Sequence, residues 1–594
     1  MSRLPQMSDA RTVRVHHACQ PEDANAIATI ESSDSVVAKS LYSVTWKVPK
    51  MRIVRTILLV TLVASVTAQG AGGDFEPQDF NITAALEKLG VPVGTLPKPA
   101  LESGAHKHRS LELSCSLACT SLELLFGGDK VLSEGSLPYE AFTRTYWAAQ
   151  QGALDPSCVI KPAKTLDVST VILIARLYQC PFAVKGGGHG AWAGASSIEG
   201  GITISLEDFR QANVATDKST VDIGPGLRWV DAYTAVEKEG LGVVGGRMAP
   251  VGVSGLILGG GISHFANKLG WACDNVASFE LVTASGRATN VTSESFPDLY
   301  WALRGGGNNF GVVTNFKLNT FPLGQMWGGQ RGYLEDTFPA VVTATHDFAT
   351  VGSQQDPDAA LFVVFTTLPG VGRAAFANLH YAKPVVNAPV FDQWNSISSI
   401  SDTTGLRTMS GMANHLEEGA PEPGAYQAFW GISLKMNKDL LQFTIDTFFE
   451  QEATIADVEK ILFVMAIQPI TKGALKAMQK NGGNALGLDL GNGPYFIVNF
   501  NVAWTKKENE PRFHKVISNV ISIVKTKARE MDADNDFVYL NYGSQYQDPI
   551  NSYGSENQQR LITISKKYDP AQVFQYLQPG GFKLAKGAPN PSSP

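Results

Sequence analysis

Glycine-rich loops and one histidine are the features of this sequence with the clearest chemical potential. Four glycine clusters lie at 186–190, 252–255, 259–261 and 305–311. Because glycine has no Cβ, loops made of it can bring backbone N–H groups close to a phosphate. One such cluster is more often a tight turn, but four within about 125 residues indicate a long, phosphate-bearing ligand.

The histidine is His189, in the run Lys185-Gly186-Gly187-Gly188-His189-Gly190. A lone histidine in a loop usually serves only as a hydrogen-bonding group. Here glycines on both sides leave the ring free to meet whatever the loop binds. The position directly after an apolar run therefore predicts a ligand contact.

Two common nucleotide-binding motifs do not account for these loops. No cluster is followed by Gly-Lys-Ser or Gly-Lys-Thr, which excludes a P-loop. Residues 188–193 match G-x-G-x-x-A, but 193–201 are too rich in glycine and serine for the helix that a Rossmann fold requires.

The elements that would position the loops fall into two regions. In the first, about 158–325, short apolar runs alternate with the glycine clusters. They predict strands at 182–184, 202–204, 221–223 and 310–318, a helix over 297–303, and a hairpin from 279–284 and 288–291.

The second region, about 326–530, has longer apolar runs. They predict strands at 361–365, 429–434, 461–466 and 495–502, and amphipathic helices at 440–449 and 513–531. An antiparallel sheet covered by helices on one face fits this pattern, which makes the chain an α+β protein.

Size and charge restrict the class of protein. The 594 residues exceed one ordinary core, so two or three domains are expected. Hydrophobic residues make up 44% and charged residues 18%, as in folded globular proteins. The net charge of −6 offers no basic surplus, so we expect neither a nucleic-acid partner nor stable membrane association.

A secretory signal is predicted from Met51 to Ala68. Two arginines precede the apolar run 57–66, and small residues follow it at 66–68. The run is too short to span a bilayer. We interpret residues 1–50 as a gene-model extension; a long leader or a signal anchor is the alternative.

The cysteines and two glycosylation sequons agree with secretion. Cleavage after Ala68 leaves five cysteines, enough for two disulfides and one free thiol in an oxidising compartment. Cys115 or Cys119 with Cys158 would staple the N-terminal segment to the first domain. No CxxC occurs, and no metal site is predicted. The sequons begin at Asn81 and Asn290.

The run from Cys158 to Leu323 resembles the FAD-binding domain of the vanillyl-alcohol oxidase superfamily, in particular the berberine-bridge-enzyme-like FAD-linked oxidases of plants and fungi. The similarity extends over about 115–584. The motifs that carry it are 182–189, 251–253 with 259–261, 270–275, 304–311, 539–542 and 567–570.

This resemblance implies a PCMH-type FAD-binding domain over 115–325 and a substrate domain over 326–530. A C-terminal segment, 531–584, would return to the FAD domain. Residues 69–114 remain as a weakly patterned linker or arm, and 585–594 as a tail.

The resemblance also assigns cofactor residues. His189 would bond covalently to the flavin, and Gly186, Gly187, Gly188 and Gly190 would hold the pyrophosphate. The other cofactor-side residues implied are Val251, Gly252, Gly255, Gly261, Asn275 and Asn541. Bicovalent members carry a cysteine where Met248 stands here, so the link is predicted to be single.

For catalysis, Tyr542 and Tyr539 are the candidates implied by the Tyr-x-Asn-Tyr motif, with an aromatic core edge as the alternative. The expected activity is oxidation of an alcohol or amine carbon of a small molecule, such as a sugar or secondary metabolite, with oxygen as acceptor. A dehydrogenase with another acceptor and a non-catalytic flavin-pocket protein are the alternatives. The resemblance places Val251 at the position that gates oxygen beside the flavin, where a valine is short enough to leave an apolar gap; a core residue of the sheet is the alternative.

Overall fold

The structure, a computed structural model, describes residues 75–98, 110–421 and 423–592. Every described residue belongs to one compact unit, 69–594. The predicted extension 1–50 and signal peptide 51–68 lie outside the described residues. None of the helices in the described ranges is both long and apolar enough to cross a bilayer.

The first sheet supports the histidine loop. Its four strands lie in the order β1-β2-β4-β3, and β2 and β3 both run parallel to β4. Helix α5 connects β2 to β3, which ends at Lys185, so the strand predicted before His189 is confirmed. The elements are β1 (Val131–Ser133), β2 (Cys158–Ile160), α5 (Thr165–Tyr178), β3 (Phe182–Lys185) and β4 (Ile202–Ser205).

The N-terminal segment is an arm that packs, not a free linker. Helices α1 (Ile82–Lys88) and α2 (Leu111–Phe126) both contact α5. Leu86 is fully buried, and the side chains of Glu76 and Arg176 form a buried ion pair of 2.7 Å. In 75–98 the apolar residues are interspersed with Pro, Gly and Lys and form no long periodic pattern, which is why the sequence did not predict their packing.

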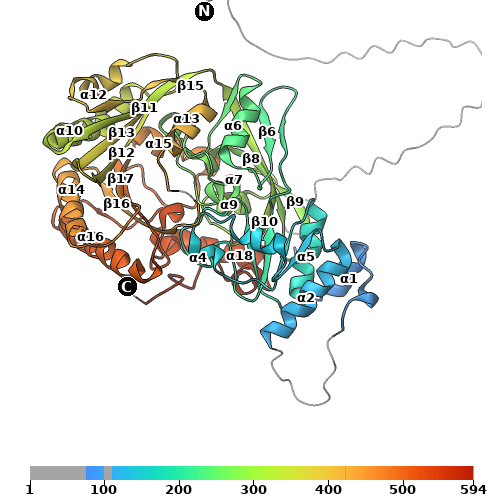
Figure 1. The fold of residues 1–594 in the computed structure, drawn as a ribbon. Coiled ribbons are helices and arrows are strands. Elements are labelled where there is room, and N and C mark those ends of the chain that lie inside the picture. Colours follow the sequence, from blue (N-terminus) through green and yellow to red (C-terminus); the bar gives the residue numbers. More distant parts are fainter. Residues whose placement is uncertain (1–74, 99–109, 422, 593–594) are drawn as a thin grey trace, which may run out of the picture. The chain divides into compact units, whose positions relative to one another are not determined.

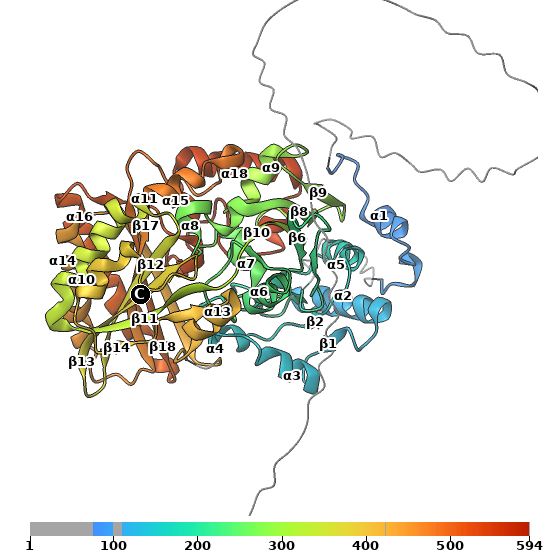
Figure 2. The same ribbon diagram turned by 90° about the horizontal axis from the view of Figure 1, so that it is seen from above.

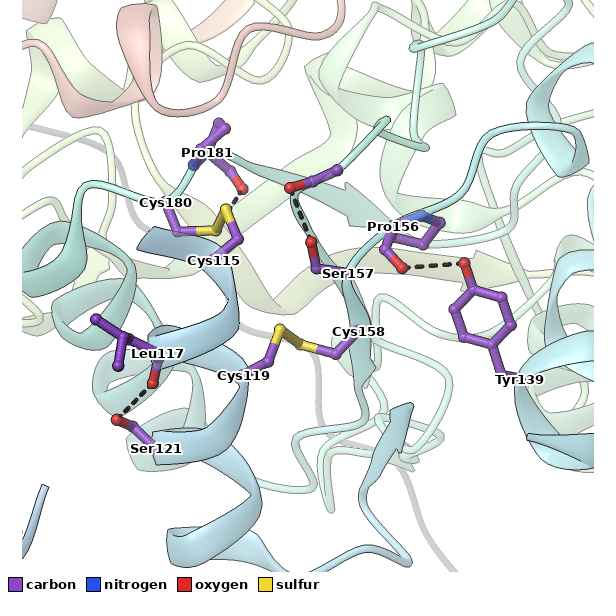
Figure 3. Close-up of a disulfide and its surroundings, with 11 residues drawn as sticks. Cys115, Leu117, Cys119, Ser121, Tyr139, Pro156, Ser157, Cys158, Cys180 and Pro181 are labelled. Carbon is purple, nitrogen blue, oxygen red and sulfur yellow. Dashed lines mark hydrogen bonds between the residues drawn. A yellow bond between two sulfur atoms is a disulfide. The ribbon is translucent and has the colours of Figure 1, made fainter. Parts of the chain in front are cut away.

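Two disulfides fasten α2 to this sheet, as Figure 3 shows. Cys119 bonds to Cys158 in β2, which is one of the two pairings expected. Cys115 bonds to Cys180, two residues before β3 begins. The remaining thiol in the described part of the chain, Cys273, is buried. The bridges therefore tie α2 to β2 and to the residues just before β3, the strand that leads to the histidine loop.

The second sheet has six strands, in the order β5-β6-β10-β8-β9 with β7 paired to β10. β8 and β9 form the predicted antiparallel hairpin, and α9 has the predicted bounds. The elements of this part are β5 (Ala212–Val214), β6 (Thr220–Ile223), α6 (Trp229–Glu237), β7 (Leu241–Val243), α7 (Val253–Leu258), α8 (Ala266–Leu269), β8 (Val276–Val282), β9 (Ala288–Val291), α9 (Pro297–Leu303) and β10 (Val312–Pro322).

The third sheet has nine strands, in the order β14-β11-β13-β12-β17-β18-β16-β19 with β15 paired to β11. All pairings within it are antiparallel, as the sequence predicts. The strands are β11 (Met326–Leu334), β12 (Ala359–Leu368), β13 (Gly372–Tyr381), β14 (Ser401–Asp402), β15 (Gly405–Arg407), β16 (Tyr426–Lys435), β17 (Leu462–Ile470), β18 (Tyr495–Trp504) and β19 (Asp534–Asn535).

Helices α10 (Phe338–Asp347), α14 (Lys438–Ala453) and α16 (Glu510–Glu530) lie along one face of this sheet (Figures 1 and 2). Alternate strand residues such as Phe463, Met465 and Ile467 point into the core between sheet and helices. Because side chains alternate along a strand, the intervening residues point to the opposite face. That face carries Phe429, Gln468 and His380, and it meets the first two sheets at Trp147, Arg247 and His264.

The C-terminal segment returns to the first part of the molecule. The hydroxyl of Tyr568, in α18, donates to Asp298 of α9 at 2.7 Å. The remaining helices are α3 (Leu137–Thr143), α4 (Ala149–Gly152), α11 (Ser353–Gln355), α12 (Asp392–Ser396), α13 (Met409–Glu417), α15 (Lys472–Ala477), α17 (Pro549–Ser552), α18 (Ser555–Tyr568) and α19 (Val573–Tyr576), with short 3-10 turns between them.

Candidate active site

The histidine loop packs tightly against a second glycine loop. A Cβ placed on Gly187 would lie 2.4 Å from the Cα of Gly252, and one on Gly186 would lie 2.1 Å from the Ser254 hydroxyl. Gly188 has a φ of +69°, which side chains rarely permit. The clusters at 186–190 and 252–255, separated by more than 60 residues in sequence, thus form one surface.

His189 is half-buried on this surface and stacks on Trp147, with ring centroids 4.1 Å apart and planes 12° apart. The backbone N–H of Trp147 donates to the carbonyl of Gly188, which ties this residue to the loop. Burial lowers the pKa of His189 to about 4. The imidazole is therefore neutral at physiological pH, and it has a nitrogen lone pair to offer an electrophile.

Two cations flank the glycine loop, and sequence reasoning gave neither a role. The buried Lys185 ammonium donates to Thr145 Oγ1 at 3.0 Å, and burial lowers its pKa to about 8. Arg228 lies 3.6 Å from the position of a Gly187 Cβ, and its guanidinium donates to the Pro250 carbonyl. Lys185 could have been suspected from its place before the glycines; nothing near Arg228 in sequence marks it.

Tyr542 lies at the opposite side of the site, where three separate segments meet. Arg247, from the loop after β7, donates to the Tyr542 hydroxyl at 2.9 Å, and Gln468, from β17, donates to it at 2.9 Å. The tyrosine ring packs edge-on to Phe429, with centroids 5.9 Å apart. Phe429 in turn lies 5.3 Å from Trp147, so a series of rings leads from Tyr542 to His189.

Tyr539 has a different environment. Its buried hydroxyl oxygen accepts the N–H groups of Gly261 at 2.9 Å and Ile262 at 3.2 Å, and an amide N–H of Asn541 at 2.9 Å. Burial raises its pKa well above the usual range. These contacts favour a positioning role for Tyr539, which fixes the 259–261 loop, over the catalytic role predicted from its spacing.

Asn541 and Asn275 also hold loops. The Asn541 amide donates to the Leu256 carbonyl at 3.0 Å, and its oxygen fills the place of a Gly259 Cβ. The Asn275 amide donates to the carbonyls of Leu269 and Trp271 and accepts from Lys480. Both amide side chains thus form hydrogen bonds within the protein. Their predicted contacts with a cofactor stay predictions.

Val251 is half-buried in the loop before α7, and its carbonyl accepts a hydrogen bond from the backbone N–H of Trp229 at 3.0 Å. Met248 is half-buried in the same loop, and Gly255 is exposed on α7. Val251 directly precedes Gly252 of the paired glycine loops, and its place beside a flavin stays a prediction.

Comparison with known proteins shows the family of the chain. A family model described as an FAD binding domain matches residues 156–292. The FAD-dependent monooxygenase drtC of Aspergillus calidoustus is 35% identical over 477 residues, which cover 79% of this chain and 90% of that protein. The chain belongs to this family of FAD-dependent oxidoreductases. The bifunctional solanapyrone synthase of Alternaria solani is also similar, at 30% identity over 89% of this chain and 100% of that protein.

Solved structures of low sequence identity share the fold of this chain. The fold resembles that of 6-hydroxy-D-nicotine oxidase from Arthrobacter nicotinovorans, with a TM-score of 0.64 and 20% identity over 75% of this chain and 96% of that one. It also resembles a BBE-like protein of Physcomitrella patens, with a TM-score of 0.64 and 17% identity over 78% and 98%.

The residues present fit FAD. The paired glycine loops leave no room for side chains, so backbone groups form their surface. The two cations beside them, Lys185 and Arg228, suit a pyrophosphate. The neutral His189 ring lies at the end of the loop, on the side that carries Trp147 and Phe429.

Proposed function

We propose that this chain is a secreted oxidase that removes a hydride from an alcohol or amine carbon of a small molecule and uses oxygen as the electron acceptor. The observation that supports it most is the Tyr542 hydroxyl, held by Arg247 and Gln468 at the end of the ring series that leads to His189. When bound, FAD supplies the two-electron oxidation of the substrate C–H bond.

His189 would hold FAD through a single covalent bond. Its neutral imidazole offers a nucleophilic nitrogen, and Trp147 fixes the orientation of the ring. Met248 stands where bicovalent relatives have a cysteine, and a thioether cannot add as a thiolate does. Lys185 and Arg228 would balance the charge of the pyrophosphate.

Tyr542 would act as the general base that takes the substrate O–H or N–H proton. The Arg247 guanidinium donates a hydrogen bond to the tyrosine oxygen and holds it in place. Gln468 fixes the direction of the hydroxyl. Overall the substrate loses two electrons and two protons, and oxygen gains them as hydrogen peroxide.

Secretion is supported by the two disulfides and by the predicted signal. Both sequon asparagines, Asn81 and Asn290, are exposed. The mature chain would begin near Gln69. N-terminal sequencing of the protein from culture medium checks this, and recovery of residues 1–50 would contradict it.

A second candidate is oxygen insertion, which is favoured by the relatives named monooxygenases. The two reactions differ in where oxygen atoms go. With ¹⁸O₂, an oxidase releases labelled hydrogen peroxide and an unlabelled organic product, whereas a monooxygenase places one label in the product. A panel of alcohols and amines, scored for peroxide and for label, decides between them.

Val251 gives a test of oxygen as the acceptor. Val251→Leu adds a methylene that a close-packed site has little room for, so we expect stopped-flow reoxidation in aerated buffer to slow by about tenfold or more. Val253→Leu, in the buried core of α7, is the matched control. Wild-type reoxidation no faster than that of free reduced flavin, or no effect of Val251→Leu, would contradict the assignment.

A further inference from the structure

Two buried histidines face each other beside the proposed active site, and the mechanism does not use them. His264, in the loop before α8, and His380, in β13, are 3% and 1% exposed, and their ring centroids are 3.8 Å apart. None of their four ring nitrogens has a hydrogen-bond partner. Buried polar atoms in folded proteins nearly always have partners, so four together require an explanation.

The rings border a small cavity that adjoins the catalytic residues. Its volume is about 30 Å³, and Arg247, Phe362, Asn267 and Gln468 line it together with the two histidines. About 10–15 Å³ accommodates one water, so this cavity has room for about two oxygen atoms. Arg247 and Gln468 also hold Tyr542, which places the cavity directly behind the groups that would receive the substrate.

The charges around the cavity favour a negatively charged ligand. Arg247 forms no ion pair with any carboxylate of the described residues, and its guanidinium lies over the Phe362 ring at 4.5 Å. Burial, with a further effect of the Arg247 charge, lowers the pKa of both histidines, that of His380 to about 3. Each neutral ring then has one N–H to donate.

A metal ion does not fit this environment. No group of three or more His, Cys, Asp or Glu side chains within the described ranges could hold one, and the Arg247 charge would repel it. An anion fits better, because a carboxylate has two oxygens and accepts strong hydrogen bonds from a guanidinium and from N–H groups.

We propose that the cavity formed by His264, His380 and Arg247 binds a carboxylate of the substrate, so that this enzyme acts on organic acids. The acid group would lie with the pair of imidazoles on one side and Arg247 on the other. The carbon to be oxidised would lie on the Tyr542 side of Arg247. This inference rests on the proposed function for its substrate, but the anion site itself does not.

The test compares acetate with acetamide, which has nearly the same shape but no charge. Binding to the purified wild-type holoprotein is measured by calorimetry at constant ionic strength. We expect acetate to bind at least tenfold more tightly, a difference of about 1.4 kcal/mol. Equal binding of the two compounds would overturn the proposal, and this comparison needs no variant to fold.

Variants locate the site. His264→Phe and His380→Phe keep a ring in the core but remove the N–H donors, so each should reduce the preference for acetate to below threefold. The matched control His346→Gln changes a histidine of α10 outside the cavity and should keep it. Folded variants that retain the full preference would contradict the assignment.

The outcome is separable from that of the proposed function. A protein that carries flavin and oxidises neutral alcohols, with no preference for acetate, would refute the acid site alone. A protein that prefers acetate but carries no flavin would refute the proposed function alone.

Discussion

At the scale of single residues, the assignment of Tyr542 rests on its contacts rather than on its motif. The resemblance favours Tyr542, the second tyrosine of Tyr-x-Asn-Tyr, and keeps Tyr539 as a further candidate; the contacts in the structure differ between the two. Tyr539 accepts two backbone N–H groups of the 261–262 loop, whereas Tyr542 contacts the side chains of Arg247 and Gln468. These partners lie nearly 300 and more than 70 residues away, so no local pattern could predict them.

Tyr542→Phe should lower kcat by about 10²- to 10⁴-fold, because it removes the proposed base but keeps the ring that packs on Phe429. Flavin content should stay at the wild-type level. The control is Tyr546→Phe in the same segment, which stacks on Trp430 away from Arg247 and should keep near wild-type turnover. Steady-state kinetics on an oxidised substrate from the panel measures this. A decrease in kcat of less than fivefold for Tyr542→Phe would show that Tyr542 is not the general base.

His380 gives the structure a specific response to acid. Its ordinary pKa of about 6.5 applies in the unfolded chain, and burial, then the charges of Arg247, His415 and Arg407, hold it at about 3 in the folded protein, where His264 also faces it. As the pH falls below 6.5, the unfolded chain binds a proton that the folded protein does not. Stability is therefore lost as the pH falls from about 6.5 towards 3.

The matching experiment compares urea unfolding of wild type and His380→Phe. Between pH 6.5 and pH 5, wild type should lose about 1.5 kcal/mol more of its unfolding free energy than the variant. Between pH 6.5 and pH 8 wild type should gain only about 0.4 kcal/mol relative to the variant, because the histidine of the unfolded chain is half-protonated at pH 6.5. Parallel curves over the whole range would show that His380 is not held neutral.

At the scale of elements, much of the local structure could be predicted from the sequence. Helix α9 and the β8–β9 hairpin follow from a proline at the first helical turn and from Ser285-Gly286-Arg287 between two apolar runs. The long strands of the third sheet follow from their apolar runs. The arm at 75–98 could not be predicted in this way, because its burial depends on Arg176 and α5, which lie about 100 residues away.

The disulfides lead to a prediction about the elements that hold His189. Cys119→Ala with Cys158→Ala opens a loop of 39 residues and should lower the unfolding free energy by about 2–4 kcal/mol. Because β2 belongs to the sheet that positions β3, flavin incorporation should also fall. Calorimetry and the ratio of visible to ultraviolet absorbance measure the two effects. Unchanged stability with unchanged flavin content would contradict this role.

At the scale of the whole molecule, the two halves contribute different residues to one site. The glycine loops and His189 come from the first two sheets, and Phe429, Gln468 and His380 come from one face of the third. The sequence predicts the glycine loops and the sheet, since both depend on local composition and period. It does not predict Arg247, Arg228 or the pair His264–His380, because isolated polar residues acquire their roles only when distant elements pack together.

Whether the first half of the molecule holds FAD through His189 can be tested directly by peptide analysis. The purified protein is precipitated with acid and digested, and its peptides are analysed by mass spectrometry. We expect the yellow colour to stay with the precipitate and a single flavin-bearing peptide to contain His189, while His189→Ala releases its flavin to the supernatant. Flavin that leaves the wild-type protein on precipitation, or a flavin bonded to any other residue, would contradict the account.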